Sequence, residues 1–171
     1  MAIDFPASPT NGQQFTPIAG LSYVYNGYAW DLVSGGVSNA AFHAMLSADQ
    51  TGVANETFTK VAFNTASFNI GGYYNTSTQR WVPPVGVGNI IAAVYFSAGL
   101  LLGTPIQIAL YKNGTIFKRE FCSASADYGS ASISVVDNAN GSDYYEVYVN
   151  VMSGATATIS SGASYTYFQA R

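Results

Sequence analysis

The sequence is poor in charge. Asp, Glu, Lys and Arg make up 9% of its 171 residues, far below the roughly 25% that is usual for soluble domains. Hydrophobic residues reach 49% and aromatic residues 15%, so the chain is too apolar to stay disordered and long enough to bury a core. Such a chain has to hide apolar surface from water, which favours oligomerisation or docking on a larger particle. The alternative is a monomer whose surface is rich in tyrosine and serine.

Basic clusters are also missing. The six Lys and Arg residues are scattered singly apart from Lys118 and Arg119, whereas nucleic-acid binding needs a clustered basic face. We therefore expect no nucleic-acid partner. The single cysteine, Cys122, cannot form an internal disulfide and is expected to be a small buried hydrophobe.

No apolar run approaches the roughly 20 residues that span a bilayer, so no membrane insertion is expected. The segment Met1 to Pro6 lacks the basic start and apolar core of a signal peptide. These features predict synthesis and assembly in the cytoplasm, even for a protein that later leaves the cell in a particle.

Catalytic groups are scarce. His43 is the only histidine, and no pattern places a nucleophile and an orienting acid beside it. The nine acidic residues include no recognisable pair of the kind that cleaves glycosidic bonds. We predict that the protein is not an enzyme and needs no cofactor.

One loop carries oxygen ligands close together. Asp137, Asn138, Asn140 and Asp143 form a set that Ca²⁺ accepts. The same residue types also favour turns for purely local reasons, so the sequence leaves calcium binding open between Asp137 and Asp143. No set of His and Cys suits zinc.

Strand patterns dominate the rest of the chain. Ile106, Ile108 and Leu110 alternate with more polar neighbours, as expected for a half-buried strand. Asn113-Gly114 predicts a tight hairpin. The predicted strands are 42–46, 58–63, 68–74, 81–83, 90–97, 105–111, 115–122, 131–136, 144–152 and 165–168. About ten short strands at regular spacing predict an all-β, antiparallel jelly-roll sandwich over residues 40–171.

The first 34 residues form a separate small module. Strands around 13–16 and 21–25 lead to Asn26-Gly27, a strong hairpin signal. A Gly/Ser linker is expected over 35–39. Because a hairpin is marginal in water unless it packs on something, its aromatic residues are expected to anchor it to a larger assembly. These anchoring residues are Phe5, Phe15, Tyr23, Tyr25, Tyr28 and Trp30.

Two segments resemble known families. The segments 5–15 and 23–30 resemble a small module near the termini of phage structural and tail-fibre proteins, which implies attachment within a virion. The motifs in 68–86, 94–97, 108–114, 143–151 and 164–168 are similar, in their order, to the globular heads of complement and tumour-necrosis-factor-like proteins. That resemblance implies a ten-stranded jelly roll that assembles as a tight trimer.

The aromatic excess has two interpretations. The first is a homotrimer interface made of Tyr73, Tyr74, Trp81, Tyr95, Tyr165 and Tyr167. The second is a stacking platform for a cell-surface sugar. Any receptor site is expected on the loops 123–130 and 138–142.

These features together predict a bacteriophage virion protein that forms a short trimeric fibre or knob. Its partners would be other tail or capsid proteins and a host glycan or protein. The alternatives are a capsid decoration protein that stabilises the shell and, less favoured, a polysaccharide-degrading spike.

Overall fold

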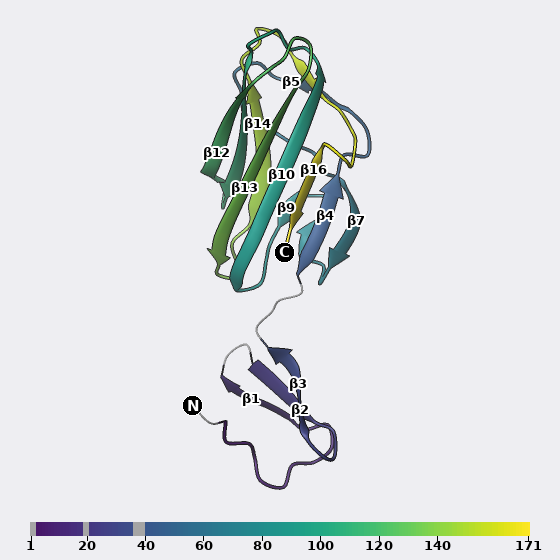
Figure 1. Cartoon of the computed structure of the whole chain (residues 1–171), viewed down its shortest axis with the longest axis vertical. Helices are drawn as coiled ribbons and strands as arrows, with labels where there is room; N and C mark the ends of the chain where they lie inside the picture. Colours follow the sequence, from purple (N-terminus) through teal and green to yellow (C-terminus); the bar gives the residue numbers. More distant parts are fainter. Residues whose placement is uncertain (1–2, 19–20, 36–39) are drawn as a thin grey trace. The chain divides into compact units, whose positions relative to one another are not determined.

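The chain divides into two compact units, Met1–Ser38 and Asn39–Arg171, which we call the N-terminal unit and the head. The computed structural model describes residues 3–18, 21–35 and 40–171. Every regular element among them is a β-strand (Figure 1), which confirms the all-β prediction. Of the linker expected over 35–39, residues 36–39 lie outside the described residues.

The N-terminal unit is a three-stranded antiparallel sheet in the order β1 (Gln14–Ile18), β2 (Leu21–Tyr25) and β3 (Trp30–Gly35). The predicted hairpin is therefore extended by a third strand. Tyr25 pairs with Trp30, so the Asn-Gly turn is a four-residue loop and not a two-residue turn. The Asn26 side-chain oxygen accepts the N–H groups of Tyr28 and Ala29, which holds this loop in place.

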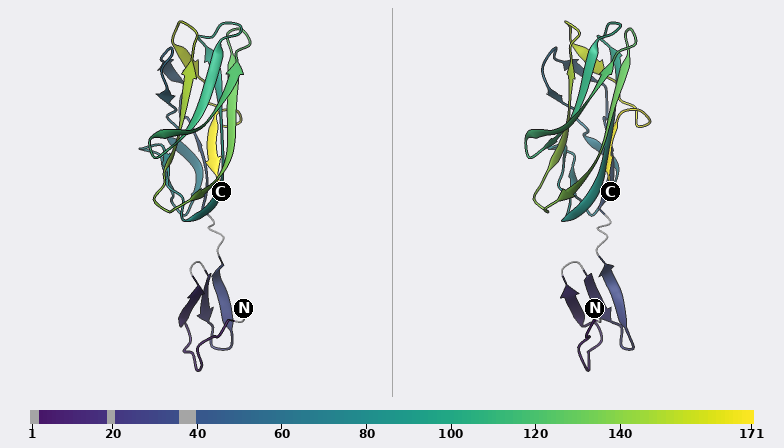
Figure 2. Two further views of the ribbon diagram at one scale, coloured as in Figure 1. Left: turned by 90° about the vertical axis from the view of Figure 1, so that its left-hand side faces the viewer. Right: turned by 60° about the vertical axis from the view of Figure 1, so that its left-hand side comes forward.

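The head consists of two antiparallel sheets packed face to face; the side views show the two layers (Figure 2). The first sheet contains β5 (Gln50–Val53), β15 (Ala157–Ile159), β10 (Gly86–Ala98), β16 (Tyr167–Ala170), β4 (Ala41–Met45) and β7 (Thr65–Ile70), with β13 (Gly129–Ala139) paired to β10. The second contains β12 (Thr115–Ser123), β11 (Pro105–Lys112), β14 (Tyr145–Val151), β9 (Arg80–Trp81) and β8 (Tyr74–Asn75), with β6 (Thr59–Lys60) paired to β14.

Alternation along the strands builds the core between the sheets. In β10 every second side chain from Ile90 to Phe96 is buried, and Ile106, Ile108 and Leu110 of β11 are fully buried opposite it. Gln107 and Ala109 are buried as well, so β11 is covered on both sides and is not the half-buried strand that its sequence predicted. Burying one such side chain stabilises the fold by about 1.5–3 kcal/mol. The half-buried Cys122 packs against this core.

The tight turn predicted at Asn113-Gly114 is confirmed. Lys112 pairs with Thr115, and the two turn residues have φ angles of 53° and 81°. Positive φ at both positions is the requirement of the hairpin turn that Asn-Gly favours.

Ten of the thirteen strands of the head, β4 to β16, contain at least three residues. Eight of these ten were predicted, whereas the predicted strands 58–63 and 81–83 shrink to the two-residue β6 and β9. The sequence missed β5 and β15, which pair with each other, because four and three residues are too few to show alternation.

Candidate functional site

The outward side of β7, β4, β16 and β10 is a continuous surface, which we call the outer apolar face. The strand register aligns its side chains in rows across the sheet, because Gln169 pairs with both Ile91 and His43, and His43 pairs with Phe68. The members of the face, row by row, are Ile91, Gln169, His43 and Phe68, then Ala93, Tyr167, Met45 and Thr65, and finally Tyr95.

The outer apolar face has one charged side chain at its border, Arg171, and none on its strands. None of its four strands contains Asp, Glu, Lys or Arg. Its apolar side chains still reach solvent in the single chain, and Phe68 is 48% exposed. The neighbouring charged residue is Arg171, which directly follows β16. Contiguous exposed apolar surface of this kind is typical of protein–protein interfaces.

His43 lies in the middle of the face. Its imidazole stacks with the Phe68 ring on one neighbouring strand and the Tyr167 ring on the other, at centroid distances of 6.2 and 5.7 Å. Its Nδ1 atom lies 3.1 Å from the Ser67 hydroxyl oxygen. Among the described residues, no acidic side chain hydrogen-bonds to His43, so the third member of a hydrolytic triad is not in place.

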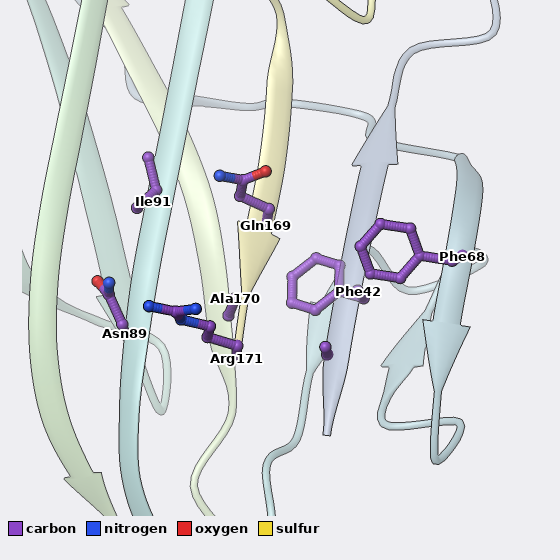
Figure 3. Close-up of a pocket in the computed structure, with 8 residues that line it drawn as sticks. Phe42, Phe68, Asn89, Ile91, Gln169, Ala170 and Arg171 are labelled. Atoms are coloured by element: carbon purple, nitrogen blue, oxygen red, sulfur yellow. The ribbon is translucent and has the colours of Figure 1, made fainter. Parts of the chain in front are cut away.

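A shallow depression of about 280 Å³ opens on the same face. Figure 3 shows Phe42, Phe68, Asn89, Ile91, Gln169, Ala170 and Arg171 around it. The main-chain carbonyl of Arg171 accepts the Asn89 N–H at 2.8 Å, which fixes the end of β16 beside β10. The volume of the depression lies just below the roughly 300–1,000 Å³ of most small-molecule sites.

The predicted trimer-interface residues divide into two groups. Tyr95 and Tyr167 lie on the outer apolar face, half-exposed. Tyr165 is exposed. Its ring packs edge-on against Tyr95 at a centroid distance of 5.1 Å, which places it beside the face. Tyr73 lies between β7 and β8, outside the four strands of the face. For these four residues the interface role stays a prediction.

Tyr74 and Trp81 require a correction. They are 3% and 2% exposed in the single chain, so they belong to the core of one protomer and not to an interface. Tyr74 stacks on Phe42 at 4.4 Å and donates its hydroxyl to the Phe63 carbonyl. Trp81 packs against Tyr145 at 5.5 Å. Both alternate with outward neighbours along their strands, which directs them between the sheets.

Phe68 and Ile91 also belong to the face, although neither was among the predicted interface residues. They occupy outward positions in strands that carry no charged residue on either side. The outward side of a strand normally carries polar residues when it is exposed to water. A strand without charge on either side was therefore the sequence feature that could have indicated an interface.

The outward side of the second sheet, which we call the outer charged face, carries ion pairs. Glu146 of β14 is 2% exposed and accepts hydrogen bonds from Lys60 Nζ at 2.6 Å and Arg80 Nε at 2.8 Å. Burial alone raises the pKa of the Glu146 carboxyl, but these two cations outweigh it and hold the pKa below its usual value. The carboxylate therefore stays ionised.

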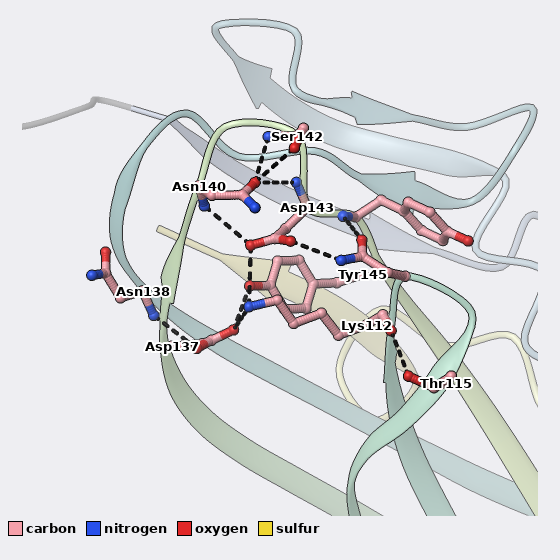
Figure 4. A network of polar contacts seen from close by, with 10 residues as sticks. Lys112, Thr115, Asp137, Asn138, Asn140, Ser142, Asp143 and Tyr145 are labelled. Carbon is pink, nitrogen blue, oxygen red and sulfur yellow. Dashed lines mark hydrogen bonds and ion pairs between the residues drawn. The ribbon is translucent and has the colours of Figure 1, made fainter.

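The candidate calcium ligands form a network around Lys112 (Figure 4). Lys112 Nζ lies 2.7 Å from Asp137 Oδ2 and 3.1 Å from Asp143 Oδ2. The Asn113 amide also donates to Asp143, and this bond together with Lys112 lowers the pKa of the Asp143 carboxyl despite partial desolvation. The side-chain ammonium thus supplies the positive charge that a calcium ion would bring.

Asn140 and Asn138 do not complete a metal site. The Asn140 side-chain oxygen accepts the N–H groups of Ser142 and Asp143, and Asn138 donates its own N–H to Asp137. These bonds are those of a structured turn, and they give the loop 138–142 a local structural role. Within 3–18, 21–35 and 40–171, no three His, Cys, Asp or Glu residues are grouped to hold a metal ion.

The predicted anchoring residues of the N-terminal unit pack on one another. Phe5 stacks on Trp30 at 5.4 Å and meets Tyr23 edge-on at 5.0 Å. The rings in this cluster are those of Phe5, Phe15, Tyr23, Tyr25 and Trp30. They are half-buried, so they serve first as the unit's own small core, whereas Tyr28 is 94% exposed. Anchoring stays a prediction.

The described part of the chain contains no helix that is long and apolar enough to cross a membrane.

Comparison with known proteins gives structural neighbours only. No protein-family model and no curated protein matches the sequence. The globular domain of zebrafish complement 1qA matches with a TM-score of 0.53 and 12% identity, over 78% of this chain and 96% of that one. Murine APRIL gives 0.57 and 15%, over 77% and 96%. Eiger TNF from S. frugiperda gives 0.54 and 11%, over 77% and 88%.

These neighbours establish the fold of the larger part of the chain. It is an antiparallel jelly-roll sandwich of the complement C1q and tumour-necrosis-factor type, accompanied by a small three-stranded N-terminal sheet. At 11–15% identity, the likeness concerns the fold and not the activity.

Proposed function

We propose that this chain is a structural protein of a bacteriophage particle that acts by assembly and binding. In this proposal three heads meet through their outer apolar faces, and the trimer forms a short fibre or knob that contributes to host attachment. The observation that carries the assembly is the outer apolar face, whose four adjacent strands are uncharged and carry half-exposed aromatic rings.

A trimer accounts for the composition of that face. Apolar surface removed from water contributes about 25 cal/mol per Å², and charged side chains are depleted at the centres of interfaces. The complement and tumour-necrosis-factor type of fold is associated with tight trimers, which supports three copies over two.

The particle role is supported by the N-terminal unit. Its residues 5–15 and 23–30 resemble modules of phage structural and tail-fibre proteins, and its core consists of only a few half-buried rings. A unit this small gains stability by packing on a partner. Docking through this unit leaves the head free for display.

A binding role is favoured over catalysis. The one histidine of the chain contacts Ser67 and two aromatic rings. The buried acid Glu146 is held ionised by Lys60 and Arg80, which does not suit a proton donor in glycoside cleavage.

Light scattering coupled to size exclusion tests the assembly. The full chain has a mass of 18.1 kDa, so we expect a single species of about three times that mass. A species of one chain mass across micromolar concentrations would refute the trimer.

Electron microscopy of intact particles, with an antibody against the head, tests the location. We expect label on a fibre or knob, and infection blocked by excess purified protein. Label confined to the capsid lattice, with no effect on infection, would replace the attachment role with capsid decoration. Degradation of host capsule by the protein would instead indicate a spike enzyme.

A further inference from the structure

His43 is placed to make assembly depend on pH. It lies at the centre of the outer apolar face, in the row that runs from Ile91 through Gln169 to Phe68. It is the single histidine of the chain. No second imidazole can therefore contribute to a pH effect. Among the side chains, histidine is the one whose ordinary titration falls between about pH 5 and 8.

The groups that face His43 offer no negative charge. On β7 these are Ser67 and Phe68, and on β16 they are Tyr167 and Gln169. Farther along the sheet, the outward positions of β10 hold Asn89, Ile91, Ala93 and Tyr95. The charged side chain next in line is Arg171, beyond the end of β16, and it is itself positive. Its main-chain carbonyl is taken by the Asn89 N–H.

We propose that the outer apolar face assembles only while His43 is neutral, so that mild acid separates the trimer into folded single chains. This inference rests on the proposed assembly through that face. Closing the interface removes water from the imidazole. A proton there would leave a buried cation without an anionic partner, which is strongly unfavourable.

The aromatic neighbours oppose this effect only weakly. A protonated imidazole gains some attraction from the faces of Phe68 and Tyr167. Those stacking contacts exist in the separate chain too, and although the loss of water strengthens a cation–π contact, the gain is smaller than the cost of burying an unpaired charge. The loss of water occurs only on assembly, and it therefore decides the direction.

Linkage gives the size of the effect. Each chain must lose one proton to assemble, so each pH unit below the titration range lowers the association constant of a trimer by up to about 10³-fold, tenfold for each of three histidines. Above that range the association constant is independent of this group.

The test uses the full chain and two variants, with mass measured by light scattering between about pH 7.5 and pH 5.5. We expect the wild-type chain to change from trimer to single chains over this interval. His43→Gln keeps a neutral polar group and should remain trimeric throughout. His43→Lys carries a permanent charge and should be a single chain at both pH values, with an unchanged circular dichroism spectrum.

The outcomes separate this inference from the proposed function. A wild-type chain that stays trimeric at the lower pH overturns the switch and leaves the trimer intact. A His43→Gln variant that dissociates as the wild type does also overturns it, because another group then senses the proton. A wild-type chain that is single at every pH refutes both, while an unfolded chain at the lower pH refutes the switch.

Discussion

The two outward faces of the head differ in their charged residues, although both cover the same hydrophobic core. The outer charged face surrounds Glu146 with two cations, while the outer apolar face has none of the four charged residue types on its strands. Both faces cover the same kind of buried layer, so the fold accepts charge on its outside. The absence of charge from the strands of one face is what the proposed assembly through that face requires.

The largest expected effect comes from breaking the core that both faces share. Trp81→Ala removes a fully buried ring that packs on Tyr145 and Phe42, which should lower the free energy of unfolding by about 3–5 kcal/mol. Chemical denaturation of wild type and variant measures it. Trp81→Phe keeps an aromatic ring and should lose less; equal and small losses would mean that the ring is not in the core.

Charge placed on the outer apolar face should produce the next effect. Tyr167→Asp puts a carboxylate beside His43 and Met45, and at about pH 7.5, the upper end of the interval tested above, we expect the trimer association constant to fall by at least about 10³-fold, since charged side chains are depleted at interface centres. Light scattering gives the mass. The separate chains should stay folded because Tyr167 is only half-buried.

The matched control for this variant lies on the opposite side of the sandwich. Phe121→Asp replaces an exposed ring on β12, in the sheet of the outer charged face. We expect the trimer to survive this change. Dissociation by Phe121→Asp, with Tyr167→Asp still trimeric, would exchange the roles that we assign to the two faces.

The fold was largely predictable because alternation is a local property. Strand β11 shows it in Ile106, Ile108 and Leu110, and the Asn113-Gly114 turn follows from backbone geometry alone. Each pattern lies within a few consecutive residues. Strands β5 and β15 were missed because they are short and are recognisable only through pairing with strands that are distant in the sequence, β15 with β5 and with β10.

The candidate site was less predictable because alternation does not say which side of a strand faces inward. Tyr73 and Tyr74 are adjacent and of one type, yet only Tyr74 enters the core. Selecting interface residues by their aromatic character therefore mixed core rings with surface rings. Phe68 was not predicted because its contact with His43 is made only by the pairing of β4 with β7.

The ion pairs of the outer charged face should make a smaller contribution to stability than the core. Glu146→Gln removes the carboxylate that pairs Lys60 and Arg80, and should cost about 1–2 kcal/mol at neutral pH, since both cations keep contact with water. The pKa of Glu146 is lowered by folding, so its contribution is present above the ordinary value of 4.5 and is lost as the pH falls below it.

Thermal unfolding at neutral and acidic pH tests this dependence. The wild-type midpoint should fall more steeply below about pH 4.5 than that of Glu146→Gln. Glu120→Gln, at an exposed acid of β12, should follow the wild type at every pH. Parallel curves for wild type and Glu146→Gln would mean that the ion pairs add nothing to stability.

The smallest expected effect concerns calcium. Because Lys112 already lies between Asp137 and Asp143, millimolar Ca²⁺ should leave the wild-type unfolding midpoint unchanged. Lys112→Ala leaves the two carboxylates without that cation and should lower the midpoint by about 2–4 °C, the equivalent of about 1 kcal/mol. Added Ca²⁺ should recover part of this loss, since two neighbouring carboxylates suit that ion. Stabilisation of the wild type by Ca²⁺ would show instead that the metal displaces Lys112, and the loop would then be a binding site and not only a turn.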